Sequence, residues 1–142
     1  MSSPAGLQQI DYAQEPDLPV EEFIEVLQNS GLGERRPIHD RNVIASMLSQ
    51  ATLILTARSN GKLVGVARAL TDFSFCTYLS DLAVDVEYQR RGIGRELIRQ
   101  THVAAGLKTS LILLAAPAAV DYYPHIGLQN HPSFWMIPGQ SR

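Results

Sequence analysis

The sequence is poor in cysteine and has no excess of positive charge. The single cysteine, Cys76, cannot form an internal disulfide, and there is no cysteine cluster for a structural zinc site, so we expect a reducing, cytoplasmic location. The 12 basic residues are outnumbered by 14 acidic residues, and the formal net charge is -2. A strongly basic nucleic-acid-binding protein is therefore disfavoured.

Long hydrophobic runs and metal-binding patterns are also missing. No apolar stretch approaches the ~20 residues that cross a bilayer, and residues 1–10 have neither the basic nor the apolar region of a secretory signal, so we expect no membrane partner. The four histidines show no metal-ligand spacing, and we predict no metal site; they are His39, His102, His125 and His131.

What is present is a chain with the size and composition of one globular domain. It has 142 residues, of which 45% are hydrophobic and 18% are charged, and it contains no internal repeat or interdomain linker. We therefore expect a single domain over residues 1–142, with residues 1–5 loose.

Periodicity and turn residues predict an alternation of helices and strands. A helix is expected from Pro19 to Gly31 and a second after Asp40, which is suited to cap it. Asn60-Gly61 predicts a hairpin between two strands. The remaining predictions are strands at 6–12, 77–84, 110–116 and 133–137, a helix at 95–105 and a short helix before Gly127. The strand at 110–116 is expected to be covered on both faces, in a βαβ unit with the strand at 77–84.

The loop Gln89-Arg90-Arg91-Gly92-Ile93-Gly94 stands between a predicted strand and a predicted helix. Glycines allow close approach of a ligand to the backbone, and the first amides of a helix have no partner within the helix, so this position favours an anion such as a phosphate. Arg90, Arg91 and Arg95 add positive charge. The alternative interpretation is a glycine-bearing turn with solvated arginines. Neither a P-loop nor the third glycine of a dinucleotide fingerprint is present.

The segment LAVDVEYQRRGIGRELI, which contains this loop, resembles motif A of the GCN5-related N-acetyltransferase (GNAT) superfamily, whose signature is Q/R-x-x-G-x-G/A after a strand. A second segment, AVDYYPHIGL, resembles a later motif in which an aromatic-Tyr pair precedes a Gly-hydrophobic pair. The two motifs occur in the family's order, and the resemblance extends from Gly6 to Ile137.

The resemblance implies a single-domain α/β fold, with a mixed, mostly antiparallel sheet, helices on both faces and splayed central parallel strands. It also implies that acetyl-CoA binds in the splay. Pantetheine would pair with the backbone of Leu82, Ala83 and Val84, and the pyrophosphate would meet the loop formed by Gln89, Arg90, Arg91, Gly92, Ile93, Gly94 and Arg95. Relatives often have an asparagine where this chain has Ala116, so backbone contacts to pantetheine are expected here without that side-chain contact.

Two residues are candidates for proton transfer. The resemblance implies that Tyr123 is the general acid, because a phenol with a pKa near ~10 stays protonated at neutral pH and can protonate a departing thiolate. Its alternative is a packed core aromatic, which is the interpretation favoured for Tyr122. Asp81 is the first candidate for the base, since relatives with an aspartate here have it at the acceptor site. Its alternative is a carboxylate bonded to loop amides.

The acceptor is less well defined by the sequence. The resemblance places Arg35, Arg36, His39 and residues 72–75 beside the acceptor site, although adjacent arginines are more often solvated or paired with a nearby acid. Phe134 and Trp135 are interpreted as core or as the edge of a homodimer. We predict an acetyl-CoA-dependent N-acetyltransferase acting on a small-molecule or peptide amine. The alternatives are a non-catalytic CoA-binding sensor or interaction module and, less favoured, a nucleotide-binding regulator.

Overall fold

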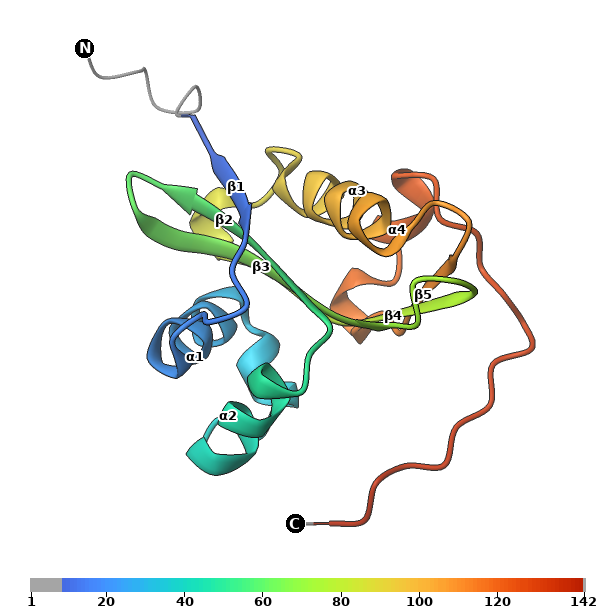
Figure 1. Cartoon of the computed structure of the whole chain (residues 1–142), viewed down its shortest axis with the longest axis horizontal. Coiled ribbons are helices and arrows are strands. Elements are labelled where there is room, and N and C mark those ends of the chain that lie inside the picture. Colours follow the sequence, from blue (N-terminus) through green and yellow to red (C-terminus); the bar gives the residue numbers. More distant parts are fainter. Residues whose placement is uncertain (1–8, 142) are drawn as a thin grey trace.

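The computed structural model describes residues 9–141, which form a five-stranded sheet with helices on both faces (Figure 1). The strands lie in the order of the chain, β1-β2-β3-β4-β5; the first three pairings are antiparallel and β4 pairs with β5 in parallel. The elements are β1 (Asp11–Gln14), α1 (Val20–Ser30), η1 (Leu32–Arg35), α2 (Arg41–Ser49), β2 (Leu53–Ser59), β3 (Lys62–Thr71), β4 (Cys76–Val84), η2 (Val86–Tyr88), α3 (Ile93–Ala105), β5 (Ser110–Leu113), η3 (Pro117–Ala119) and α4 (Tyr122–His125).

Local signals placed most of these elements correctly. Gly31 ends α1 in the left-handed conformation, with φ of 87°, and its amide donates to the Gln28 carbonyl. The Asp40 carboxylate caps α2 by accepting a hydrogen bond from the Val43 amide, at 3.3 Å. Asn60 and Gly61 both have positive φ and connect β2 to β3, which confirms the predicted hairpin. The predicted loose residues 1–5 and the beginning of the predicted strand at 6–12 lie outside the described residues.

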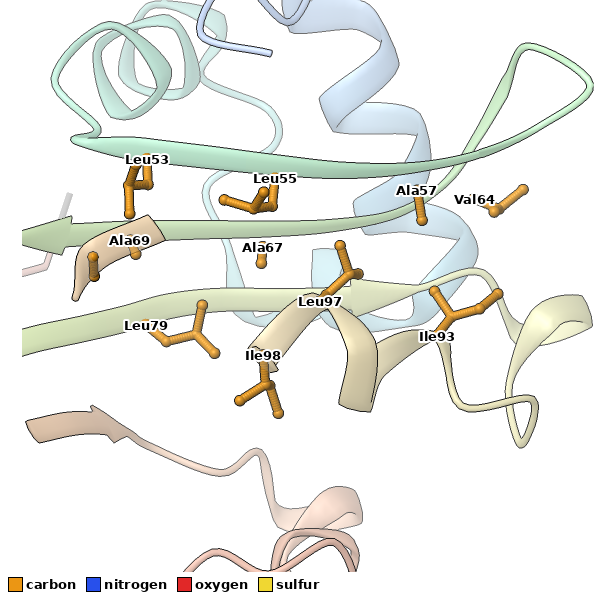
Figure 2. Close-up of a cluster of buried hydrophobic side chains, with 11 residues drawn as sticks. Leu53, Leu55, Ala57, Val64, Ala67, Ala69, Leu79, Ile93, Leu97 and Ile98 are labelled. Atoms are coloured by element: carbon orange, nitrogen blue, oxygen red, sulfur yellow. The ribbon is translucent and has the colours of Figure 1, made fainter. Parts of the chain in front are cut away.

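The sheet separates two hydrophobic cores. On one face, side chains of β2 and β3 pack against Ile93, Leu97 and Ile98 of α3 (Figure 2). On the other face, Phe23 and Leu27 of α1 and residues of α2 form the second core. Strand β3 is buried from Leu63 to Ala69, because both of its faces and both of its edges are covered. The mixed α/β fold with helices on both faces is therefore confirmed.

Strands β4 and β5 are joined at one end only. Cys76 to Leu79 pair with Ser110 to Leu113, and β5 then ends while β4 continues to Val84. A buried hydrogen bond of 2.8 Å between the Thr77 and Thr109 hydroxyls joins β4 to the residue that precedes β5, where the pairing of the two strands begins. The strands therefore stop pairing where β4 still has five residues to run, Ser80 to Val84.

Four predicted boundaries were wrong. β1 begins at Asp11 and runs to Gln14, past the predicted end at residue 12. β5 ends at Leu113 rather than at residue 116 and is half-exposed, because among the described residues no further strand covers its outer edge. Ser133 lies in a turn and residues 134–137 form no strand, since a strand needs a partner for its ladder; Phe134, Trp135, Met136 and Ile137 are exposed. α3 begins two residues earlier than predicted, directly after Gly92.

Candidate active site

The unpaired edge of β4 is the first component of the site. Register pairs Val66 with Ala83 and Arg68 with Asp81, and the Asp85 amide donates to Val64, so alternate residues of β4 exchange hydrogen bonds with β3. Leu82 and Val84 lie between these positions, and their amides and carbonyls therefore point away from β3. β5 has already ended on that side. An extended ligand with amide groups can pair with this edge as a strand would.

Side chains close both ends of this edge. The Ser80 carbonyl accepts a hydrogen bond from Arg36 at 2.8 Å, and the Val84 carbonyl accepts one from the Gln89 side-chain amide at 2.9 Å. Ser80 lies at an irregularity where the register of β3 and β4 shifts between Arg68 and Ala69. Between the two capped carbonyls, the backbone groups of Leu82 and the Val84 amide face the opening.

The second component is the loop that leads into α3. Gly92 is the N-cap of α3 in the left-handed conformation, with φ of 82°, a geometry that costs an L-residue with a side chain roughly 1–2 kcal/mol. The first hydrogen bond of the helix runs from the Glu96 amide to the Gly92 carbonyl, at 3.0 Å. The amides of Ile93, Gly94 and Arg95 precede it and point out of the helix end, where the helix dipole favours an anion.

Arginines surround the N-terminus of α3. Arg90, Arg91 and Arg95 are exposed. Arg91 lies over the Tyr88 ring, with its guanidinium carbon 5.1 Å from the ring centroid, which holds this side chain beside the loop. Of the predicted phosphate-loop residues, 89–92 lie between η2 and α3, and Ile93, Gly94 and Arg95 form the first turn of α3.

A hollow of about 340 Å³ lies beside the first two turns of α3. Gly92, Arg95, Glu96 and Arg99 line one part of it, with Glu96 paired to Arg99, and Ile126 and Leu128, which follow α4, line another. It therefore combines charged surface of both signs, with Arg95 nearest the helix start, and apolar surface.

The third component is the tyrosine pair of α4. Tyr123 is partly buried and packs against the core that also contacts Leu82 and Val84. Burial raises the pKa of Tyr123 above its ordinary value of 10.0, and the neighbouring Tyr122 phenol adds to the shift. The phenol therefore stays protonated at neutral pH. Tyr122 packs edge-on against Tyr123, with ring centroids 5.3 Å apart, and its hydroxyl extends to Gly94.

Asp81 is fully buried between two arginines. One carboxylate oxygen accepts a hydrogen bond from Nε of Arg36 and the other from Nε of Arg68. Arg68 also donates to the Ser80 hydroxyl at 3.0 Å. This Arg36-Asp81-Arg68 cluster was missed at the sequence level, which paired neither arginine with Asp81 and expected loop amides as the alternative partners of the carboxylate.

The other acceptor-side candidates are less organised. Arg35 and His39 are exposed. The Asp72 carboxylate accepts hydrogen bonds from the amides of Ser74, Phe75 and Cys76, at 2.7–3.1 Å, and closes the turn between β3 and β4. These amides lower the pKa of Asp72 from 3.8 to about 2. Asp72 thus holds the conformation of residues 72–75, the segment that the family resemblance places beside the acceptor site.

Among residues 9–141, no group of three or more histidine, cysteine or acidic side chains is arranged to hold a metal ion. Over the same residues, no helix has the length and hydrophobicity needed to cross a membrane.

Comparison with known proteins connects this geometry to a family. The chain is 35% identical over 82 residues to GCN5-related N-acetyltransferase 2, chloroplastic, of Arabidopsis thaliana, covering 52% of the chain and 31% of that protein. It is 28% identical over 109 residues to the uncharacterized N-acetyltransferase ycf52 of Gracilaria tenuistipitata var. liui, covering 71% and 60%. The chain therefore spans less than two thirds of the length of these relatives.

Solved structures share the fold. A GNAT-family acetyltransferase from Streptococcus pneumoniae TIGR4 superposes with a TM-score of 0.73 at 19% identity, covering 92% of this chain and 100% of that one. The aminoglycoside N-acetyltransferase AAC(6')-Iy, in complex with CoA, superposes with a TM-score of 0.70 at 13% identity, covering 94% and 97%. A family profile described as "Acetyltransferase (GNAT) domain" matches residues 20–133. The chain belongs to the GNAT acetyltransferase family.

Proposed function

We propose that the protein transfers the acetyl group of acetyl-CoA directly to a primary amine of a small molecule or a protein. The observation that carries this proposal is the continuous path from the open edge of β4, at Leu82 and Val84, to the amides at the start of α3. Acetyl-CoA has the same sequence of groups, because its pantetheine amides are followed by a pyrophosphate. Family membership supports the same activity.

The residues of the path fit this ligand part by part. The Leu82 amide and carbonyl and the Val84 amide would pair with pantetheine amides. The amides of Ile93, Gly94 and Arg95 would hold the pyrophosphate. The hollow beside α3 would receive the nucleotide end, with the Arg95 guanidinium suited to a phosphate and the apolar wall of Ile126 and Leu128 suited to the base. When bound, acetyl-CoA supplies an activated acetyl thioester.

Tyr123 is the proposed general acid. As the amine nitrogen bonds to the acetyl carbonyl carbon and the carbon–sulfur bond breaks, the phenol would donate its proton to the thiolate. The raised pKa keeps this proton in place until then. A protonated phenol next to the core that carries Leu82 and Val84 is suited to this role.

The amine must also lose a proton, either before attack or from the product. In our proposal this proton passes to water, and Asp81 positions the acceptor side of β4 instead of removing the proton itself. Both carboxylate oxygens of Asp81 are already occupied by Arg36 and Arg68, and the side chain is fully buried, so an amine could reach it only after Arg36 moved away. The arrangement supports a role in holding the connector after α1 against β4.

The amine acceptor is proposed at the level of class. Neighbouring structures include aminoglycoside acetyltransferases, which is consistent with a small-molecule amine, and their likeness to this chain concerns the fold. The alternative function is a CoA-binding sensor of the same fold without turnover. The presence of Tyr123, packed against the core that also contacts Leu82 and Val84, favours the enzyme over this alternative.

The decisive experiment measures release of free CoA from acetyl-CoA with an amine panel that includes aminoglycosides, polyamines, amino acids and lysine peptides. An enzyme should show amine-dependent release that falls by about 10²-fold in Tyr123→Phe, while its affinity for acetyl-CoA is kept. Tyr12→Phe on β1 serves as the matched control and should leave release unchanged. Binding of acetyl-CoA without release under any amine would support the sensor, and absence of binding would refute both functions.

A further inference from the structure

Tyr122 extends from α4 to the loop that begins α3. An ideal Cβ placed on Gly94 would lie 2.9 Å from the Tyr122 hydroxyl oxygen, so the hydroxyl lies directly over the one face of Gly94 that a side chain would otherwise cover. Burial raises the pKa of the Tyr122 phenol, and the Arg95 backbone amide, which faces the same hydroxyl, partly offsets that rise. The sequence favours a packing role for Tyr122, and no sequence pattern indicates its contact with Gly94.

The hydroxyl therefore occupies a position that the proposed function reserves for a phosphate oxygen. The Arg95 amide has one hydrogen to donate, and it cannot make a full hydrogen bond to both a phenol oxygen and a phosphate oxygen. Space beside Gly94 is limited as well, because the Tyr122 hydroxyl oxygen lies 2.9 Å from the Cβ position and blocks the approach of a second group to this residue. Binding of a phosphate here and the present position of Tyr122 exclude one another.

Tyr122 is also connected to Tyr123. The two rings meet edge to face, with centroids 5.3 Å apart and planes at 69°, and both belong to the four-residue helix α4. Such pairs contribute beyond their buried area, so a movement of one ring changes the preferred position of the other. Tyr122 is partly exposed, with 37% of its surface accessible, which leaves room for its ring to turn outward.

We propose that Tyr122 is a positioning residue, whose hydroxyl is displaced from the Arg95 amide by a cofactor phosphate and whose ring then guides Tyr123 to the thioester. This inference rests on the proposed function and deepens it, because it makes occupation of the phosphate loop a condition for placing the general acid. A ligand that reaches the β4 edge without filling the loop would leave Tyr122 on Gly94 and Tyr123 in its present position.

The first test compares the affinity of CoA for the wild-type chain, Tyr122→Phe and the control Tyr12→Phe, by calorimetric titration. Phenylalanine keeps the ring and removes the hydroxyl that competes for the Arg95 amide, so CoA should bind about three- to tenfold more tightly. Tyr12→Phe should bind as the wild type does. Pantetheine, which has no phosphate, should show the same inhibition constant with all three proteins.

Two results would overturn the competition. If Tyr122→Phe bound CoA with wild-type or lower affinity, the hydroxyl would be no competitor. If the affinity for pantetheine changed by the same factor as that for CoA, the effect would not lie in the phosphate loop. Failure of the wild-type chain to bind CoA at all would instead refute the proposed function, so the two failures are distinguishable.

The second test concerns the connection to Tyr123. Tyr122→Leu removes both the hydroxyl and the aromatic contact, and we expect it to retain the tighter CoA binding but to lose at least about tenfold in kcat as Tyr123 is released. Tyr122→Phe, which keeps the ring contact, should retain kcat. Equal kcat values for the leucine and phenylalanine variants, with both melting as the wild type does, would refute the positioning role.

Discussion

Replacing Asp81 with asparagine tests the interpretation of the Arg36-Asp81-Arg68 cluster. The substitution keeps the shape of the side chain but removes its negative charge. In the folded protein the Arg36 and Arg68 side chains are only 22% and 10% exposed, and Asp81 is completely buried. The variant would therefore leave two guanidinium groups facing one neutral amide.

The expected cost follows from this burial. Breaking a buried ion pair by removing one partner costs about 3–5 kcal/mol, and the lower end applies here because Arg36 can turn toward solvent. For a chain of this size, a loss of about 3 kcal/mol lowers the melting temperature by about 10 °C. Arg36→Gln should cost less, since the Asp81–Arg68 pair remains.

The assay is a double-mutant cycle by thermal and urea unfolding, with CoA release measured in parallel. The double variant Asp81→Asn with Arg36→Gln should be more stable than the sum of the single losses predicts, because removing Arg36 relieves the repulsion that the asparagine creates. A shift of less than about 2 °C for Asp81→Asn, together with lost turnover that recovers as the pH rises, would refute our reasoning. That pattern would identify Asp81 as the catalytic base.

Further predictions concern the loop, the general acid and the β3–β4 turn. Gly92→Val and Gly94→Val should each reduce the rise in melting temperature caused by acetyl-CoA. The first would strain the loop at a positive φ, and the second would fill the approach to the first amides of α3 that the phosphate needs. The rate of acetyl transfer should hold until the pH exceeds 10.0 and then fall as Tyr123 ionises, since the pKa of its phenol is raised; a decline set by a group with a lower pKa would point to another acid. Asp72, whose pKa is lowered to about 2, should hold the turn at all pH values above its ordinary 3.8, and the turn should open only as the pH falls through about 2, as followed by the amide NMR signals of Ser74 and Phe75. Early loss of these signals near pH 4 would contradict this assignment.

The sequence by itself determined the elements whose causes are local. Gly31 ends α1 and Asn60-Gly61 turns the hairpin, because each needs only the conformational preference of one or two residues. The position of the loop before α3 was predictable for the same reason, because its glycines and the helix start are consecutive residues; its binding of an anion stays a prediction. Tyr123 was identified through motif resemblance, and its assignment as the acid stays a prediction.

Only the tertiary structure decided which distant residues meet. Arg36 and Asp81 are 45 residues apart, and the sequence alone gives no reason to prefer Asp81 over another acidic residue as the partner of Arg36. Tyr122 reaches Gly94 because α4 packs beside α3, a geometry that no local preference encodes. Residues 133–137 have the composition of a strand but form none, because strand formation depends on a partner edge as well as on the residues themselves. Local conformation is set by neighbouring residues, whereas ion pairs such as Arg36–Asp81, the contact of Tyr122 with Gly94 and strand pairing are set by the packing that brings separate segments together.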